Sequence, residues 1–411
     1  MISFFILVLL LAFPRLAPAQ EMPHPFTVAA QSAVLIDANS GQFLYGQNPD
    51  ERIKPASFVK LLTLFLIFDA IDQGQVHLDD KVWISKKAWR TGGSKMFVRQ
   101  GTRTPLVELI KGIAVVSGND ACVAVAEFLQ GNEQAFVAKM NQKLRELGLE
   151  NSQFQTVNGW PAPDQYTTSK DMALLARAYV QLFPEALQYH TLKEFTHEDI
   201  RQPNRNRLLW RDPSVDGLKT GHTEEAGYHL LATARRGDQR FVAVVMGAKS
   251  QAVREREVLR LLNYGFRNFV SVLLFEKDKA LLQLPVWQGV EGQVDLLAGE
   301  EGVVTVPIAE QNDVSWQAKT PERLFAPIDR GQTIGQAIIT IQDKVVKSVP
   351  LLADKDIPLA GFLKRTVHTV SLLVMDHRTG LLFAAIVLFG AAVLVWFLKQ
   401  RRPRRRRTTK H

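Results

Sequence analysis

Residues 55–68 read Pro-Ala-Ser-Phe-Val-Lys-Leu-Leu-Thr-Leu-Phe-Leu-Ile-Phe, and this stretch decides the fold. Because the run is apolar on every face, it predicts a helix buried inside a domain. Ser57 and Lys60 would share its first turn, where residues three apart are neighbours. A desolvated lysine can take the proton of a serine nucleophile, and the free N–H groups of a first turn favour the oxyanion of acyl transfer. The alternative is a capping serine with a lysine that extends to solvent.

Length and composition are those of a globular protein with more than one domain. The chain has 411 residues, 46% of them hydrophobic and 22% charged, so it can supply a large core. Its net charge is +9, but residues 399–411 hold eight lysines and arginines, which leaves +1 for everything else. The body therefore gives no reason to propose nucleic-acid binding. The single cysteine, Cys122, lies in an apolar helical stretch, where it would pack as a small hydrophobe.

The N-terminus is typical of a signal peptide. Ile2 to Phe13 form an apolar core too short to span a membrane, and Ala17-Pro18-Ala19 matches the small-x-small pattern that signal peptidase accepts. We predict a signal peptide over residues 1–19, cleaved after Ala19, and therefore an exported protein.

The C-terminal region predicts a membrane anchor. Residues 380–398 are 19 residues without a charge, which at about 1.5 Å per residue reach the roughly 30 Å of a bilayer core. The basic cytoplasmic tail at 399–411 would make the body face outward, and residues 359–376 read as an amphipathic juxtamembrane segment. The prediction is a single-pass protein of the inner (cytoplasmic) membrane with a periplasmic catalytic domain. The alternatives are a buried core helix and a nucleic-acid-binding tail.

The body of the chain combines strand and helix signals. Ser117-Gly118-Asn119-Asp120 would form a short loop between two helices, where a hydroxyl and an amide can point into a cleft; the alternative is helix capping. Lys219-Thr220-Gly221 would open a run of antiparallel strands, and an edge strand beside a cleft offers backbone groups to an extended peptide. Strands are predicted at 33–37, 42–45, 228–234 and 241–246, and helices at 105–116, 121–129, 134–147 and 170–180.

Three motifs follow one another along the chain: Ser57-x-x-Lys60, Ser117-x-Asn119 and Lys219-Thr220-Gly221. This is the set found in penicillin-binding proteins and class A β-lactamases. More narrowly, residues 29–269 resemble the low-molecular-mass penicillin-binding proteins that are serine-type D-alanyl-D-alanine carboxypeptidases. The resemblance implies an α/β (α+β), penicillin-binding/β-lactamase-like transpeptidase fold with an antiparallel sheet and a helical cluster. Further residues that match the family are Asn204-Arg205-Asn206, Asp216 to Thr223, Gly247 to Ser250 and Arg254.

The resemblance assigns the acyl-transfer chemistry to Ser57. This serine would attack the penultimate D-alanine carbonyl of a peptidoglycan stem peptide ending in D-Ala-D-Ala. Lys60 would be the base, and Ser117 would pass the proton onward. Because like charges disfavour double protonation, Lys60 or Lys219 would be neutral at working pH.

The resemblance also implies how the substrate is held. Asn119 would hydrogen-bond the substrate amide, and the backbone N–H groups of Ser57 and His222 would form the oxyanion hole. Gly221 would let the substrate approach closely. The terminal carboxylate would be held by Lys219, Thr220 and Arg254.

The expected ligands follow from this chemistry. β-Lactam antibiotics, which mimic the D-Ala-D-Ala terminus, would acylate Ser57 and inhibit the enzyme. Between Asn119 and Lys219 we assign no glutamate motif of the kind that class A β-lactamases use for deacylation. No His-Glu-x-x-His occurs, so neither a metal nor another cofactor is predicted. The alternatives are an endopeptidase, a transpeptidase, a weak β-lactamase, or a non-catalytic cell-wall scaffold or sensor.

The region after residue 269 predicts a second domain. Short β-type runs punctuated by glycine and proline over residues 275–355 indicate a small all-β sandwich. The resemblance implies a pedestal that lifts the active site from the membrane, and the alternative is a partner-binding module. Members of the family commonly attach to the membrane by an amphipathic C-terminal helix, whereas this chain is predicted to span it.

Overall fold

The computed structural model describes residues 25–376, 385–393 and 396, without the side chains of 373–376. The predicted signal peptide and basic tail lie outside the described residues, as do residues 380–384, 394–395 and 397–398 of the predicted span at 380–398. Within the described ranges, no helix is both long and apolar enough to cross a membrane. The chain divides into two units, one ending at Ser271 and including residues 305–308, the other comprising 272–304 and the chain after 308.

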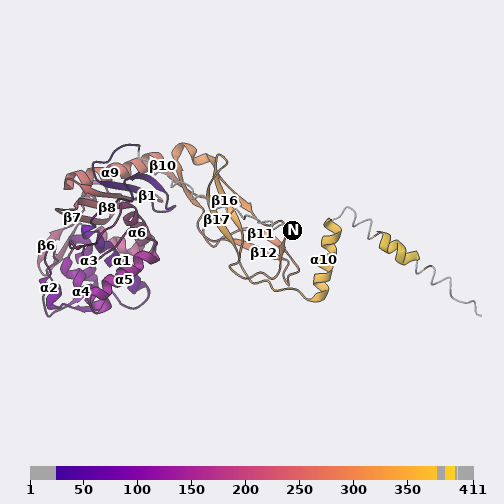
Figure 1. Cartoon of the computed structure of the whole chain (residues 1–411), viewed down its shortest axis with the longest axis horizontal. Helices are drawn as coiled ribbons and strands as arrows, with labels where there is room; N and C mark the ends of the chain where they lie inside the picture. Colours follow the sequence, from indigo (N-terminus) through magenta and orange to yellow (C-terminus); the bar gives the residue numbers. More distant parts are fainter. Residues whose placement is uncertain (1–24, 377–384, 394–395, 397–411) are drawn as a thin grey trace, which may run out of the picture. The chain divides into compact units, whose positions relative to one another are not determined.

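The first unit contains a five-stranded antiparallel sheet (Figure 1). Its strand order is β2-β1-β9-β8-β7, so β7 is an edge strand, which confirms the strand prediction for Lys219-Thr220-Gly221. The central pairing joins β1, near the start of the unit, to β9, which lies about 200 residues later. The strands are β1 (Ser32–Asp37), β2 (Phe43–Gln47), β7 (Val215–Thr223), β8 (Gly227–Arg236) and β9 (Gln239–Ala248).

The sheet is buried on both faces because helices cover each of them (Figure 1). Successive side chains of a strand point to opposite faces, so Val34 and Ile36 join one core cluster while Ala33 and Leu35 join the other. The first cluster contains most of the helices; the second contains α9 (Gln251–Asn268). The helices of the first cluster are α1 (Val59–Asp72), α3 (Leu106–Val116), α4 (Asn119–Gln130), α5 (Glu133–Glu146) and α6 (Ser169–Leu182).

Helix α1 is the buried helix that the sequence predicted. Every residue from Val59 to Phe68 is buried, and the apolar side chains show almost no preference for one face. A short 3₁₀ turn, η1 (Ala56–Phe58), precedes it and carries Ser57. Because α1 is surrounded by other helices and the sheet, its first turn is fixed in position by packing on every side.

Short elements complete the first unit. Asn119 is the first residue of α4, so the predicted loop between the two helices is shorter than expected and consists of Ser117 and Gly118. The remaining elements are α2 (Lys86–Arg90), η2 (Pro184–Ala186), α7 (Leu187–His190), α8 (Leu208–Arg211), the hairpin-like pair β3 (Lys81–Trp83) and β4 (Arg103–Pro105), and the pair β5 (Glu194–His197) and β6 (Ile200–Pro203).

The second unit is a β domain followed by a helix. Hydrogen bonds join six strands into one sheet of order β14-β16-β17-β12-β11-β15, whereas the predicted sandwich implied two separate sheets. Strands β10 (Phe269–Leu273) and β13 (Val303–Pro307), whose residues are divided between the two units, form a separate pair; η3 (Ile308–Asp313) follows, and α10 (Phe362–Asp376) comes last. The sheet strands are β11 (Ala280–Trp287), β12 (Gln293–Ala298), β14 (Val314–Lys319), β15 (Leu324–Phe325), β16 (Thr333–Ile341) and β17 (Lys344–Ala353).

Candidate active site

Ser57 and Lys60 are in direct contact at the start of α1. The Lys60 Nζ lies 2.8 Å from the Ser57 Oγ and donates a second hydrogen bond, of 2.5 Å, to the Asn158 carbonyl oxygen. Lys60 is fully buried, whereas Ser57 is half-buried and lines a cavity. Burial lowers the pKa of Lys60 from 10.5 to about 8. An amine that loses its proton near pH 8 can act as the base for the adjacent hydroxyl.

Two groups fix the turn that carries Ser57. His229 on β8 accepts a hydrogen bond from the Gly247 N–H at Nδ1, so its Nε2–H donates to the Lys54 carbonyl at 3.0 Å. Burial lowers the pKa of His229 to about 4, which keeps this arrangement neutral. On the other side lies Gly159, where an added Cβ would sit 1.8 Å from the Ala56 carbonyl oxygen. The backbone before Ser57 is therefore clamped between β8 and the loop at residue 159.

Ser117 and Lys219 form a second hydroxyl–amine pair. Ser117 ends α3 in the left-handed conformation (φ 61°), which turns its side chain inward. The Lys219 Nζ donates to the Ser117 Oγ at 3.0 Å and to the Thr220 carbonyl at 2.9 Å. Burial, and then the charge of Lys60, hold the pKa of Lys219 well below its usual value. Two desolvated amines thus lie close to two serine hydroxyls.

Asn119 and Asp120 organise the loop opposite the edge strand. The Asn119 Nδ2 donates to the Gly92 carbonyl at 2.8 Å, and its backbone N–H donates to the Ser94 carbonyl at 2.7 Å. The buried carboxylate of Asp120 accepts the backbone N–H groups of Met96, Phe97, Val98 and Ala121 at 2.9–3.2 Å. One buried carboxylate therefore holds both the start of α4 and the loop at residues 96–98.

We expect Asp120→Ala to lower the free energy of unfolding by about 3 kcal/mol or more, because three backbone N–H groups, those of the buried Met96 and Val98 among them, lose their acceptor. Urea unfolding of the two proteins measures the difference. Asp120→Asn, which keeps one amide oxygen, should lose less. A loss of under about 1 kcal/mol for Asp120→Ala would show that the loop finds other partners.

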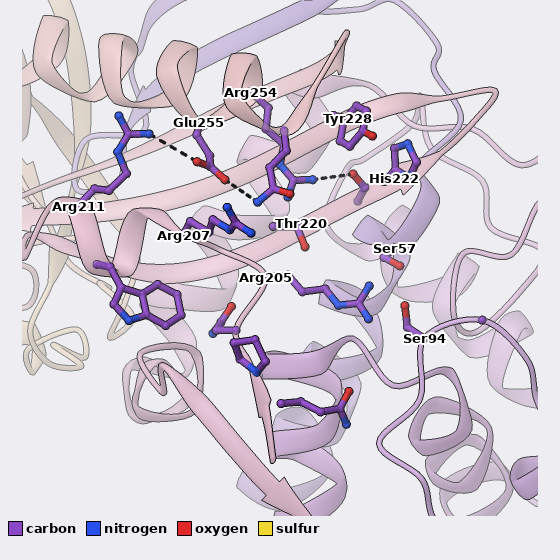
Figure 2. Close-up of a pocket in the computed structure, with 17 residues that line it drawn as sticks. Ser57, Ser94, Arg205, Arg207, Arg211, Thr220, His222, Tyr228, Arg254 and Glu255 are labelled. Carbon is purple, nitrogen blue, oxygen red and sulfur yellow. Dashed lines mark hydrogen bonds and ion pairs between the residues drawn. The ribbon is translucent and has the colours of Figure 1, made fainter. Parts of the chain in front are cut away.

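A cleft runs from Ser57 along β7 (Figure 2). Its main cavity has a volume of about 1090 Å³ and is lined by Thr220, Gly221 and His222 on one side. His222 lies against Tyr228, with ring centroids 4.0 Å apart and the two ring planes tilted by 30°. Arg254, on α9, donates to the Gly221 and His229 carbonyls at 3.3 Å. Burial lowers the pKa of Arg254 to about 10, so the guanidinium remains a cation at neutral pH.

An arginine that our site prediction omitted, Arg205, also lines the main cavity. Figure 2 shows the guanidinium of Arg205 extending toward Ser57. Its neighbours anchor the backbone: Asn206 donates to the Gly217 carbonyl at 3.0 Å and Asn204 to the Leu192 carbonyl at 2.8 Å. The signal in the sequence was the Asn204-Arg205-Asn206 triplet itself, in which two buried amides place one cation between them.

The structure brings the predicted site residues into one region. Some of them line a cavity, and the others are buried behind its walls. Thr220, Gly221, His222 and Arg254 line the main cavity with Ser57, and Asn119 lines a smaller cavity that also reaches Ser57. Lys60, Ser117 and Lys219 lie behind these walls and line neither cavity. In this structure Lys219 bonds to Ser117, and the carboxylate contact predicted for Lys219 stays a prediction, while Arg205 lines the main cavity.

The chain matches two known families in sequence. The D-alanyl-D-alanine carboxypeptidase family (peptidase S11) matches residues 18–250, and the C-terminal domain of penicillin-binding protein 5 matches residues 269–359. The chain is 39% identical to the D-alanyl-D-alanine carboxypeptidase DacC of Escherichia coli over 365 residues, which cover 87% of this chain and 91% of the relative. The chain belongs to the D-alanyl-D-alanine carboxypeptidase family.

Solved structures of similar proteins agree with this family. Penicillin binding protein 5 from Haemophilus influenzae aligns with a TM-score of 0.77 at 37% identity, covering 82% of this chain and 99% of that one. Penicillin-Binding Protein D2 from Listeria monocytogenes, solved in its ampicillin-bound form, aligns with a TM-score of 0.54 at 28% identity, covering 59% and 98%. The family that the three motifs predicted is therefore confirmed.

Proposed function

We propose that this family member is a serine D-Ala-D-Ala carboxypeptidase that removes the terminal D-alanine of peptidoglycan stem peptides through an acyl-enzyme at Ser57. The proposal rests on the 2.8 Å contact between the Ser57 Oγ, which lines a cleft containing several arginines, and the Lys60 amine buried behind it. A nucleophile and base in contact are what acyl transfer requires, and the arginines suit a substrate that ends in a carboxylate.

Acylation begins with proton transfer from Ser57 to the neutral Lys60 amine. The Oγ attacks the carbonyl carbon of the penultimate D-alanine, and the backbone N–H groups of Ser57 and His222 stabilise the oxyanion. The proton passes to the leaving amine of D-alanine, with Ser117 as the intermediate hydroxyl. The Ser117–Lys219 hydrogen bond of 3.0 Å supports that role, because it orients the hydroxyl. Water then hydrolyses the acyl-enzyme.

Substrate orientation depends on the edge strand and on two arginines. The backbone of β7 pairs with the extended substrate, and Asn119 hydrogen-bonds the substrate amide. Thr220, Arg205 and Arg254 hold the terminal carboxylate, and Lys219 keeps the site positive from behind Thr220. Peptides without this carboxylate lose the charge-assisted hydrogen bonds that fix the scissile bond over Ser57.

We also propose a membrane location, on the sequence alone. The predicted N-terminal signal peptide and the uncharged segment before a basic tail support a periplasmic catalytic domain tethered to the inner membrane. Exposed apolar side chains on α10, including Phe362, Leu363 and Val367, support contact of this helix with the membrane–water boundary. The β domain serves as the spacer between membrane and active site.

The decisive experiment measures D-alanine release from a peptide ending in D-Ala-D-Ala. The matched control ends in D-Ala-L-Ala, and a second sample is preincubated with a β-lactam and analysed by mass spectrometry. We expect release from the first peptide only, and a β-lactam adduct that abolishes it. An adduct without D-alanine release would refute the carboxypeptidase and favour a sensor; the absence of both would refute the acyl-enzyme itself.

A further inference from the structure

One buried histidine, His190, has no role in the acyl transfer described for Ser57. It is the last residue of α7 and is 1% exposed. Both nitrogens of its imidazole are hydrogen-bonded: Nδ1 lies 3.0 Å from the Leu218 carbonyl oxygen, and Nε2 lies 3.0 Å from the Tyr179 hydroxyl of α6. Leu218 directly precedes Lys219 in β7. The histidine therefore connects the helical core to the strand that carries the Lys219 amine.

The two partners of His190 determine which nitrogen carries the proton. A carbonyl oxygen can only accept, so Nδ1–H donates to Leu218, and Nε2 accepts from the Tyr179 hydroxyl. Burial lowers the pKa of His190 to about 4 and raises the pKa of Tyr179 well above its usual value. At neutral pH the imidazole is therefore uncharged and the phenol protonated, so both hydrogen bonds are kept.

The start of β7 takes hydrogen-bond donors from outside the sheet. Among the described strands β7 pairs with β8 alone, because it lies at the sheet edge. Gly217 and Leu218 are buried, and a buried carbonyl group needs a partner. The Asn206 amide donates to the Gly217 carbonyl at 3.0 Å, and His190 donates to the next carbonyl. Two side chains thus fix consecutive peptide groups directly before Lys219.

The histidine is itself held close to the strand. A Cβ added at Gly217 would lie 3.3 Å from the His190 Cβ, so the two chain segments are in close contact. The Asn204 amide donates to the His190 carbonyl at 3.3 Å, which holds its backbone. Because a close-packed interior transmits displacements, loss of the Nδ1–H bond would let the backbone at Leu218 shift. Lys219 would shift with it.

We propose that His190 is a positioning residue for acyl transfer: its Nδ1–H holds the Leu218 carbonyl and thereby keeps the Lys219 amine against the Ser117 hydroxyl, 3.0 Å away. The inference rests on the proposed function, in which Ser117 passes the proton to the leaving amine. His190, Lys219 and Ser117 line neither of the cavities at Ser57. Loss of His190 therefore slows the chemical step more than it weakens substrate binding.

Three substitutions of His190 in the full chain separate its two hydrogen bonds. Asparagine places an amide N–H where Nδ1 stands, glutamine places its amide where Nε2 stands, and leucine offers neither. The matched control is Tyr179→Phe, which removes the other hydrogen bond of the same imidazole and leaves Nδ1–H on Leu218.

The measurement is kcat and KM for D-alanine release from a stem peptide ending in D-Ala-D-Ala. Active sites are counted by complete labelling with a fluorescent β-lactam, so unfolded protein does not enter kcat. Thermal unfolding gives the stability of each variant separately.

We expect His190→Leu to lower kcat per labelled site by about ten-fold, with KM changed by less than about two-fold. His190→Asn should restore kcat to within about three-fold of the wild type, whereas His190→Gln should not. Tyr179→Phe should keep kcat within about two-fold of the wild type while lowering the melting temperature.

The inference would be overturned, with the proposed function intact, by an unchanged kcat in His190→Leu or by equal kcat values in the asparagine and glutamine variants. An equal loss of kcat in Tyr179→Phe would also overturn it, because the histidine would then only stabilise the fold. If His190→Leu does not fold and gives no labelled sites, the comparison of asparagine with glutamine decides. Absence of D-alanine release by the wild type would instead refute the proposed function.

Discussion

Replacing Lys60 with methionine is expected to slow acylation by about 10³-fold, close to the effect of Ser57→Ala, because the hydroxyl loses the base in contact with it. The rate is measured with a fluorescent β-lactam and, independently, from D-alanine release. In the wild type, only the neutral amine accepts the proton. Since burial lowers the pKa of Lys60 to about 8, the acylation rate should rise with pH to a plateau, with its midpoint near pH 8.

The same substitution is expected to leave the protein as stable as before, or more stable, at neutral pH. The pKa of Lys60 falls from 10.5 in the unfolded chain to about 8 in the fold, so keeping it protonated costs on the order of 3 kcal/mol. That cost is fully present below pH 8 and disappears as pH rises toward 10.5. It outweighs the two hydrogen bonds that methionine removes, each worth about 1 kcal/mol.

Thermal unfolding of Lys60→Met and Ser57→Ala separates these effects. A loss of activity with an unchanged or higher melting temperature supports the role of Lys60 as base. A melting temperature well below that of the wild type would mean that Lys60 is mainly structural. A flat pH profile between neutral and alkaline pH would assign the proton transfer to another group.

Most of the fold prediction came from patterns of residues that are adjacent in the sequence. The apolar run after Ser57 predicted a buried helix, and α1 is buried from Val59 to Phe68. The strand at residues 33–37 and the one after it were predicted within two residues of β1 and β2, because a turn separates two apolar runs. Both cases depend on neighbouring residues alone, so the sequence contains the whole signal.

Helix α9 was not predicted, although its buried residues Val258, Leu261 and Leu262 recur at helical spacing. What the sequence does not show is that Arg254, Glu255 and Glu257 are buried on the same helix. For Arg254 the partners lie far along the chain, because it donates to the Gly221 carbonyl, 33 residues earlier, and to the His229 carbonyl, 25 residues earlier. Only the folded chain supplies those partners.

The candidate active site, too, was only partly predictable from the sequence. The motifs named Ser57, Lys60, Ser117 and Lys219, but the pairing of Lys219 with Ser117 spans 102 residues and was not predicted. Lys60 also donates to the backbone carbonyl of Asn158. Every residue has such a carbonyl, so the type of residue 158 could not predict this contact. Side-chain motifs therefore identified the chemistry, while the fold determined which amine contacts which hydroxyl.

Replacing Gly159 with alanine is expected to lower the acylation rate by about 100-fold, because the added Cβ would displace the backbone beside Ser57. Gly159 has φ +80°, and a Cβ there would lie 1.8 Å from the Ala56 carbonyl oxygen and 3.1 Å from the Ser57 backbone nitrogen. Both neighbours are backbone atoms, so either the turn carrying Ser57 or the loop at residue 159 must move. Each movement disturbs the Lys60 bond to the adjacent Asn158 carbonyl.

Gly131→Ala provides the matched control, because Gly131 also has a left-handed φ, of +76°, but an added Cβ there meets nothing within 4 Å. The Gly131→Ala variant should lose only about 1 kcal/mol of the free energy of unfolding, from the left-handed backbone that alanine disfavours, and should acylate normally. Urea unfolding and β-lactam labelling are measured for both variants. If both variants lose the same free energy of unfolding and both still acylate normally, the loop at residue 159 moves without displacing Ser57. A selective loss in Gly159→Ala would instead establish that close backbone packing behind Ser57 sets the position of the nucleophile.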